Sequence, residues 1–142
     1  MNRTVFMLSE VELVTNSNKN MLITLGVNDL EKSINFYVGL GFMVNPDGWT
    51  ADFEMEGIRV SLCKLNKLAE DVNVYNPPEI VTGFTGITLA YNLDSEEAVD
   101  KLYTKVQELG GSVEHPPEKA KDWNGYHFYF KDLDGHYWEI AY

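Results

Sequence analysis

The feature that most constrains the fold is an internal repeat in the order of the predicted elements. Apolar, partly β-branched stretches at residues 21–27 and 86–91 each precede a helical pattern, and the tripeptide Ile-Thr-Leu occurs in both, at 23–25 and 87–89. Three further strand patterns follow each helix, so the sequence predicts two consecutive βαβββ units. We therefore expect an α+β fold in which the two units form a curved mixed sheet around a cleft.

Capping residues mark the start of each predicted helix. Asn28 or Asp29 is placed to cap the first helix, and glycines follow the end of both helical patterns. Asp94 is the predicted N-cap of the second helix, with Glu97 three residues later in a position to reach back to it. Both helices are therefore bounded by local signals.

The other strands are predicted from short apolar runs between turn signals. They are expected at residues 42–44, 49–55, 58–65, 113–115, 126–130 and 136–141, with a turn at 46–48 and a loop at 118–125. Residues 66–82 contain Asn-Pro-Pro and are predicted to be an irregular linker. Residues 1–20 are interpreted as an N-terminal extension. The rest, 21–142, is expected to be one domain with modules at 21–65 and 83–142.

Charge and cysteine content restrict the partners. The chain has 142 residues and a formal net charge of −11, which disfavours nucleic acid and anionic membranes as partners. Cys63 is the single cysteine, which fits a cytoplasmic protein, and no histidine lies at a spacing that indicates its activation as a nucleophile. No stretch reaches the length of a membrane span. The expected partner is a small molecule.

Two motifs resemble the vicinal oxygen chelate superfamily, which includes glyoxalase I, bleomycin-resistance proteins and extradiol dioxygenases. The run ITLGVNDLEKSINFY at residues 23–37, followed by GLGF at 39–42, is similar to the opening of that fold. The run FKDLDGHYWEI at 130–140 is similar to its closing hairpin. The resemblance covers residues 21–142 and implies a glyoxalase-like subgroup, the paired βαβββ fold and a homodimer.

Metal-using members of the superfamily carry His, Gln or Glu on the first and last strand of each module. The resemblance transfers these four positions to Leu22, Ser61, Gly86 and Glu139. Only Glu139 carries a ligand side chain of that kind, and a catalytic divalent ion needs several converging donors. We therefore expect no cofactor, with a divalent metal as the alternative.

Strand alternation predicts which side chains line the cleft. If Glu139 faces the cleft, so does Tyr137, while the residues between and beside them face the helix. The same alternation places His127 and Tyr129 in the cleft. For Glu139, one interpretation is a carboxylate at the rim of the cleft, and the other is a cleft-lining hydrogen-bond acceptor or general base. For His127, one interpretation is a half-exposed strand residue, and the other is a residue that contacts the ligand or acts as a base.

Other candidates lie outside these two strands. Trp123 can close over a flat ligand or simply pack in its loop. Arg59 can attract an anionic group or face solvent at a strand edge. His115, beside two prolines, and His136, in a turn, are predicted to be surface residues. The complete set of predicted ligand-binding residues is Trp49, Arg59, Ser61, Trp123, Tyr126, Tyr129 and Tyr137.

Three functions are consistent with these residues. The first is binding of a small apolar or aromatic molecule without the usual metal, as the similarity to bleomycin-resistance proteins implies. The alternative is a metal-dependent lyase or dioxygenase with non-standard ligands, for which Glu139, His127 and Asp52 are candidates. The third is a metal-free enzyme with Glu139 or His127 as general base.

Overall fold

The computed structural model describes residues 21–74, 76 and 83–142. The predicted extension at 1–20 and most of the second half of the predicted linker lie outside the described residues. The first module contains β1 (Met21–Val27), α2 (Leu30–Gly39), β2 (Asn45–Asp47), β3 (Thr50–Met55), β4 (Ile58–Lys64) and α3 (Leu65–Asp71). The second contains β5 (Thr88–Asn92), α4 (Glu96–Glu108), β6 (Ser112–Val113), β7 (Glu118–Lys119), β8 (Tyr126–Lys131) and β9 (Tyr137–Ala141).

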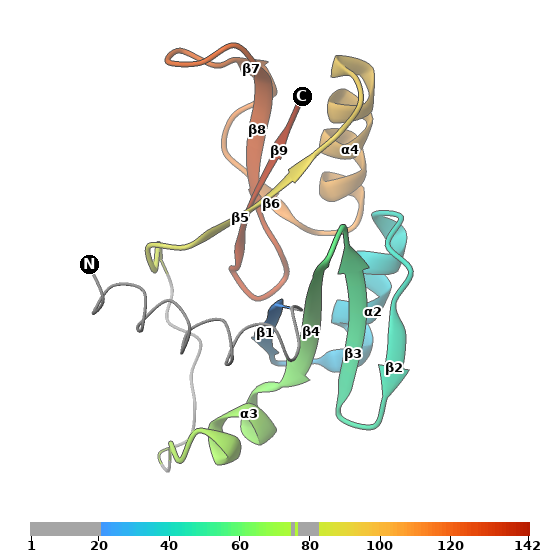
Figure 1. Cartoon of the computed structure of the whole chain (residues 1–142), viewed down its shortest axis with the longest axis vertical. Helices are drawn as coiled ribbons and strands as arrows, with labels where there is room; N and C mark the ends of the chain where they lie inside the picture. The colour runs from blue at the N-terminus through green and yellow to red at the C-terminus, as the bar shows by residue number, and fades with distance from the viewer. Residues whose placement is uncertain (1–20, 75, 77–82) are drawn as a thin grey trace, which may run out of the picture.

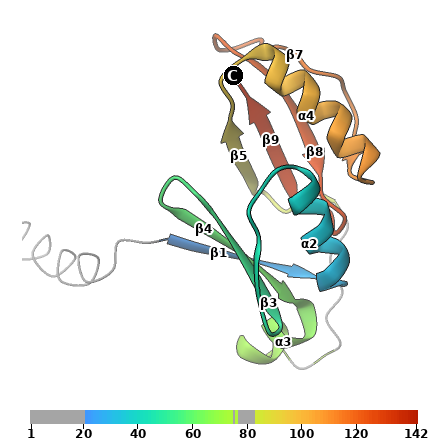
Figure 2. The ribbon, with the colours of Figure 1, turned by 90° about the vertical axis from the view of Figure 1, so that its right-hand side faces the viewer.

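The two modules form two mixed sheets of related topology. The first sheet has the order β1-β4-β3-β2, and the second has the order β5-β9-β8-β6 with β7 also paired to β8. In both sheets the first strand runs parallel to the last one, β1 beside β4 and β5 beside β9. The predicted α+β fold with two βαβββ units is confirmed. Figures 1 and 2 show α2 and α4 on the same side of the molecule, each beside its own sheet.

Alternation along the strands directs one set of side chains into the core. In β8, Phe128 and Phe130 are buried, and the ring of Phe128 meets Tyr103 of α4 edge-on at 5.3 Å. In β9, Trp138 and Ile140 are each 1% exposed. These are the residues that alternation assigns to the helix side, so the opposite face of the second sheet carries the intervening side chains.

A buried hydrogen-bond chain joins the two modules. The Tyr37 hydroxyl on α2 donates to Oδ2 of Asp132 at 2.5 Å and accepts from Nε1 of Trp138 at 3.0 Å. Burial, and then the negative charge of Asp132, raise the pKa of Tyr37 well above its usual value. The phenol therefore stays protonated and keeps both hydrogen bonds.

The turn between β8 and β9 makes two further contacts with the first module. The backbone N–H of Asn28 donates to Oδ1 of Asp134 at 2.9 Å. Nε2 of His136 lies 2.8 Å from the carbonyl oxygen of Gly26, and because a carbonyl can only accept, this nitrogen donates. His136, predicted to be a surface residue, is half-buried and links the two modules.

Some local predictions also need correction. Ser95, not Asp94, is the N-cap of α4, and its hydroxyl accepts from the backbone N–H of Ala98 at 3.1 Å. β2 begins at Asn45 instead of Phe42, whose ring packs into the aromatic core 4.8 Å from that of Phe53. The predicted loop at 118–125 begins with β7, and β6 begins one residue earlier and ends two residues earlier than expected.

The start of the predicted irregular linker is helical. α3 occupies Leu65–Asp71, a stretch rich in good helix formers. It packs against β1 at Gly26, where an added Cβ would lie 2.7 Å from Leu65 and 3.3 Å from Leu68. The absence of a side chain at Gly26 thus lets α3 approach the open face of the first sheet. None of the described helices is long and apolar enough to cross a membrane.

Candidate functional site

The open face of the second sheet forms the floor of a cavity of about 650 Å³. Its walls come from β5, β8, β9 and the segment between β6 and β8. The side chains that line it include Phe84, Trp123, His127, Tyr129, Lys131 and Tyr137. This is a size typical of small-molecule sites.

A histidine–carboxylate pair lies beside this cavity. Nδ1 of His127 is 2.7 Å from Oε2 of Glu139, and the two side chains are only 16% and 18% exposed. The pair is possible because Tyr129 on β8 lies directly opposite Glu139 on β9, which puts His127 on the diagonal of the same face. The two residues predicted as catalytic candidates are therefore in direct contact.

Aromatic rings surround this pair and continue along the cavity wall. The rings of Trp123 and Tyr129 lie 5.2 and 5.5 Å from that of His127, both in edge-to-face geometry. Phe84 meets Tyr137 edge-on at 5.4 Å. Such surfaces favour flat apolar groups, which can stack or pack edge-on against them.

Charge near the pair affects Tyr129. Burial, followed by the charge of Glu139 and a hydrogen bond to it, raises the pKa of the Tyr129 phenol. Tyr129 therefore remains a hydrogen-bond donor at neutral pH. Lys131, the next residue on the same face of β8, places its Nζ 5.7 Å from the ring centre of Tyr137.

Tyr126 points away from this cavity. Its hydroxyl donates to Oδ1 of Asp100 on α4 at 2.6 Å, and this bond is the main cause that raises the pKa of Tyr126 to about 12. It shares the helix side of β8 with Phe128, so the structure does not bring it together with the other predicted ligand-binding residues. His115, predicted to be on the surface, is exposed but lines the rim of the cavity.

The predicted site residues of the first module lie in a different place. Trp49 and Ser61 line a separate cavity of about 540 Å³ between the first sheet and α3. Arg59 is exposed on β4 and lines neither cavity. The predicted set is therefore divided between two faces, and only Trp123, Tyr129 and Tyr137 accompany His127 and Glu139.

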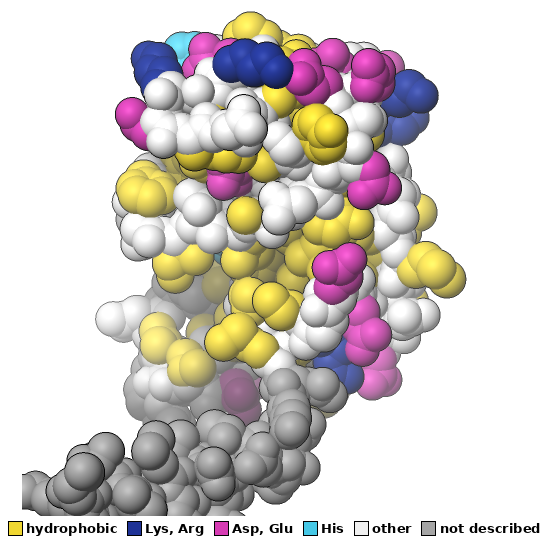
Figure 3. All heavy atoms as spheres, turned by 45° about the horizontal axis from the view of Figure 1, so that its top comes forward, with side chains coloured by type: hydrophobic (Ala, Val, Ile, Leu, Met, Phe, Trp, Pro, Cys, Tyr) yellow, Lys and Arg dark blue, Asp and Glu magenta, His cyan; other side chains and the backbone are white. Residues whose placement is uncertain are grey.

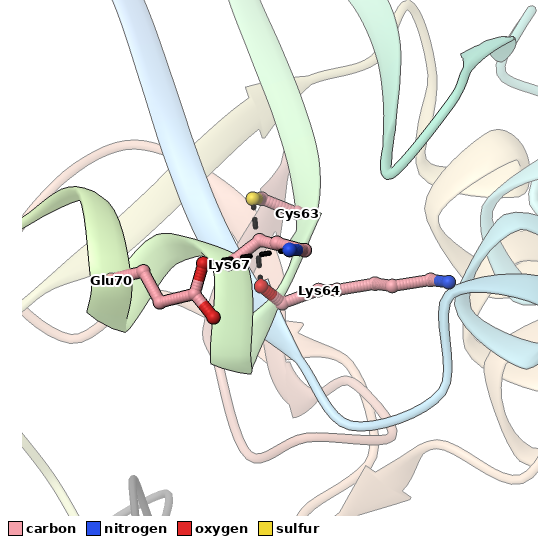
Figure 4. Close-up of polar contacts among 4 residues, drawn as sticks. All are labelled: Cys63, Lys64, Lys67 and Glu70. Atoms are coloured by element: carbon pink, nitrogen blue, oxygen red, sulfur yellow. Dashed lines mark hydrogen bonds and ion pairs between the residues drawn. The ribbon is translucent and has the colours of Figure 1, made fainter. Parts of the chain in front are cut away.

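The polar groups near this second cavity are mostly engaged with each other. Figure 4 shows Cys63 directed toward the carbonyl of Lys64, at a sulfur–oxygen distance of 3.6 Å, and Lys67 paired with Glu70 at 3.4 Å. Burial, followed by the charge of Asp71, raises the pKa of the Cys63 thiol. A raised pKa lowers the thiolate fraction, which agrees with the expectation that Cys63 is not a nucleophile.

The residues at the superfamily's metal positions do not form a donor set. Leu22 and Ser61 line the cavity of the first module, and Gly86 has no side chain. Glu139 is left as the one carboxylate, and one of its oxygens already accepts from His127. A divalent ion needs several donors converging on one point, so these residues do not fit it.

Non-standard ligands do not replace the missing donors among the described residues. Asp52 lies opposite Ser61 in the first sheet, whereas His127 and Glu139 belong to the second. Within residues 21–74, 76 and 83–142, no three His, Cys, Asp or Glu side chains gather closely enough to hold an ion. Strand alternation predicted that His127 and Glu139 share a face, but it did not predict the register of β8 against β9 that brings the two side chains into diagonal contact.

Comparisons with known proteins agree with this architecture. The model of the Glyoxalase/Bleomycin resistance protein/Dioxygenase superfamily matches residues 22–140. Among curated proteins, none matches the chain significantly. A glyoxalase-related enzyme from Fulvimarina pelagi is 32% identical, with a TM-score of 0.74 and coverage of 85% of each chain.

Two further solved structures share the fold. A hypothetical protein from S. aureus is 27% identical, with a TM-score of 0.77 over 92% of this chain and 98% of the other. A lactoylglutathione lyase from Agrobacterium tumefaciens is 21% identical, with a TM-score of 0.63 over 85% of this chain and 90% of the other. With the family match over nearly all of the described residues, the chain belongs to the glyoxalase/bleomycin resistance protein/dioxygenase superfamily, the vicinal oxygen chelate proteins.

Proposed function

We propose that this protein binds a small apolar or aromatic molecule in the cavity of the second module, without the divalent metal that its superfamily commonly uses. The observation that carries the proposal is the cavity of about 650 Å³ whose wall includes Phe84, Trp123 and Tyr137. The metal-independent part of the proposal is supported by the residues at the superfamily's four metal positions, of which only Glu139 carries a suitable ligand side chain. A reducing cytoplasm is the compartment that suits a chain with a single cysteine.

Binding of two uncharged aromatic probes, 1-naphthol and indole, tests the proposal. We expect ligand-detected NMR and thermal shifts to show binding that is unchanged by EDTA. Loss of binding on chelation, with recovery on addition of a divalent metal, would contradict the metal-independent part.

A matched pair of tryptophan variants locates the binding site. Trp123 and Trp49 are both exposed, at 46% and 56%, but they line different cavities. Trp123→Ala is expected to weaken binding about threefold to tenfold, because a well-placed aromatic contact contributes about 0.5–1.5 kcal/mol. Trp49→Ala is expected to leave the affinity unchanged. The reverse result would place the binding site in the first module.

We also propose that a second copy of the chain packs against the open first sheet. Supporting this, Leu22 of the edge strand β1 is 49% exposed and lies on the open face of the sheet, where it lines the cavity of the first module. Figure 3 shows that hydrophobic side chains gather in the middle of the face in view, between acidic and basic side chains near its edges. Light scattering after gel filtration should give a dimer mass, and Leu22→Glu should shift it toward the monomer. A monomer mass for the unmodified chain would refute this proposal.

A further inference from the structure

A groove on the helix side of the molecule is lined by residues of both modules. It lies between α4, the end of β5 and the segment that follows α2, and its volume is about 660 Å³. Its lining includes Leu40, Phe42, Tyr91, Leu93, Lys101 and Leu102. No residue of this helix-side groove lines either of the cavities on the open sheet faces. It is therefore a separate place where a ligand can bind.

The floor of the helix-side groove is apolar. The rings of Phe42 and Tyr91, one from each module, lie 5.3 Å apart. Leu40, Leu93 and Leu102 are partly buried and pack against the core, so part of each side chain stays open to the groove. The surface offered by three leucines beside two rings suits a hydrocarbon chain, which gains free energy when it leaves water.

The groove also contains two hydrogen-bond donors that are free to bind a ligand. The Tyr91 hydroxyl and the Lys101 ammonium group make no hydrogen bond or ion pair with any described residue. The other charged side chains of the lining, Lys105 and Glu108, lie 3.7 Å apart and balance each other. Lys101 therefore gives the groove a positive charge, on a chain whose formal net charge is −11. That local charge attracts an anion.

The helix ends determine which way an anionic ligand lies in the groove. A Cβ added to Gly39, at the end of α2, would lie 2.7 Å from Leu109, the residue that follows α4, so the C-terminal ends of the two helices meet (Figure 2). Both ends carry partial negative charge, which repels an anion. The anionic group is therefore expected at Lys101, before the end of α4, with the apolar part directed toward Leu40.

We propose that the helix-side groove binds a free medium-chain aliphatic carboxylate. Lys101 pairs with the carboxylate, Tyr91 donates a hydrogen bond to it, and the chain lies along α4 toward Leu40. The distance along the helix axis from Lys101 to Glu108 is about 10 Å, which suits an extended chain of about eight carbons. The proposal does not depend on the proposed function, because the two sites share no residue.

Titration with octanoate, and with octanamide as its neutral analogue of equal chain length, tests the proposal. In ¹H–¹⁵N NMR spectra of the full-length protein, millimolar octanoate is expected to shift the backbone amide signals of Gly41, Leu93 and Leu102 and to leave those of β8 in place. Octanamide should bind at least about threefold more weakly, because it lacks the charge that pairs with Lys101. Octanoate should also raise Tm, since it binds a groove that exists only in the folded chain.

Two matched pairs of variants test the residues assigned to the carboxylate. Lys101→Met keeps a long side chain and removes its charge, and should weaken octanoate binding about twofold to fivefold without changing that of octanamide. Lys32→Met is its control, because Lys32 is exposed on α2 and lines neither the groove nor the two cavities. Tyr91→Phe should weaken octanoate binding about twofold to tenfold. Tyr103→Phe, whose ring packs on Phe128 outside the groove, should leave it unchanged.

The opposite results would overturn the inference. Octanoate shifts confined to the amides of β8 and β9 would place the carboxylate in the cavity of the second module, and the naphthol and indole titrations would still test the proposed function separately. Equal affinities for octanoate and octanamide, or no binding of octanoate, would refute the groove as a carboxylate site. Shifts of the groove amides on dilution of the free protein would do the same, because they would show that a second copy of the chain covers the groove. If a variant fails to fold, the comparison of octanoate with octanamide on the unmodified protein decides.

Discussion

The substitution Tyr37→Phe tests how strongly the two modules are coupled. It removes a single hydroxyl that donates to Asp132 at 2.5 Å and accepts from Trp138 at 3.0 Å. Tyr37 is fully buried and Asp132 is 5% exposed, so water cannot easily replace the lost partner. The substitution therefore leaves a carboxylate oxygen and an indole N–H without their hydrogen bonds.

The expected loss of stability follows from these two contacts. A hydrogen bond to a charged group contributes about 1.5–3 kcal/mol, and an unpaired buried donor costs about 1–3 kcal/mol. Oδ1 of Asp132 still accepts hydrogen bonds from the backbone N–H groups of Asp134 and His136. The energetic costs of the two lost hydrogen bonds are therefore not fully additive. We expect a decrease of about 3 kcal/mol in the free energy of unfolding, which for a chain of this length lowers Tm by roughly 10 °C.

Thermal and urea unfolding measure this change. Tyr103→Phe is the control, because Tyr103 packs edge-on against Phe128 and its hydroxyl makes no hydrogen bond with the described residues. It should change stability by less than about 0.5 kcal/mol. A Tyr37→Phe variant that melts within about 2 °C of the unmodified protein would show that the buried chain contributes little.

The pKa of Tyr37 adds a pH dependence to this prediction. Because burial raises the pKa in the folded protein, the stability that Tyr37 contributes is present below the ordinary tyrosine pKa and is lost as pH rises through the folded value. The difference in Tm between the unmodified protein and Tyr37→Phe should therefore narrow at strongly alkaline pH. A difference that widened there would contradict the assigned direction of the pKa shift.

Two further predictions concern the helix cap and the module contact. Ser95→Ala should destabilise the protein by about 1 kcal/mol, because the Ser95 hydroxyl accepts a hydrogen bond from the backbone N–H of Ala98. Asp94→Ala should have little effect. Urea unfolding measures both variants, and a larger loss of stability in Asp94→Ala would contradict the observed cap. Burial raises the pKa of the Asp134 carboxyl group. The protonated carboxyl group therefore contributes stability at acid pH, and this contribution is lost as pH rises through the pKa of Asp134 in the folded protein. Asp134→Asn keeps an acceptor for Asn28 N–H, and its Tm relative to the unmodified protein should rise from acid to neutral pH; a fall would show that the charged hydrogen bond outweighs the cost of burial.

Local pattern was sufficient for much of the fold. Alternation along β8 and β9 correctly assigned Phe128, Phe130, Trp138 and Ile140 to the core, because side-chain direction repeats every two residues in any strand. The same rule placed His127 on the face opposite Phe128. The Ser95 cap was missed because two neighbouring residues can both cap a helix, and only the backbone conformation of the folded chain selects one.

The parts that were missed depend on contacts between distant segments. The helix α3 packs on Gly26, which lies 42 residues before Leu68 at the middle of the helix. A pattern read over a short stretch of sequence cannot predict that contact. Tyr126 was placed among the ligand-binding residues, but α4 supplies Asp100 as the partner of its hydroxyl. Trp49 and Trp123 were predicted as members of one binding site, yet they line cavities on different sheets.

The sequence by itself determined the repeated order of strands and helices and the buried faces of β8 and β9. These properties depend on residue type and on short-range periodicity, which the chain carries before it folds. Tertiary structure alone decided that Nδ1 of His127 meets Glu139 and that Tyr37 joins the modules through Asp132. Strand register and the packing of one module on the other bring those atoms together, and both are set by the balance of burial and hydrogen bonding over the whole domain.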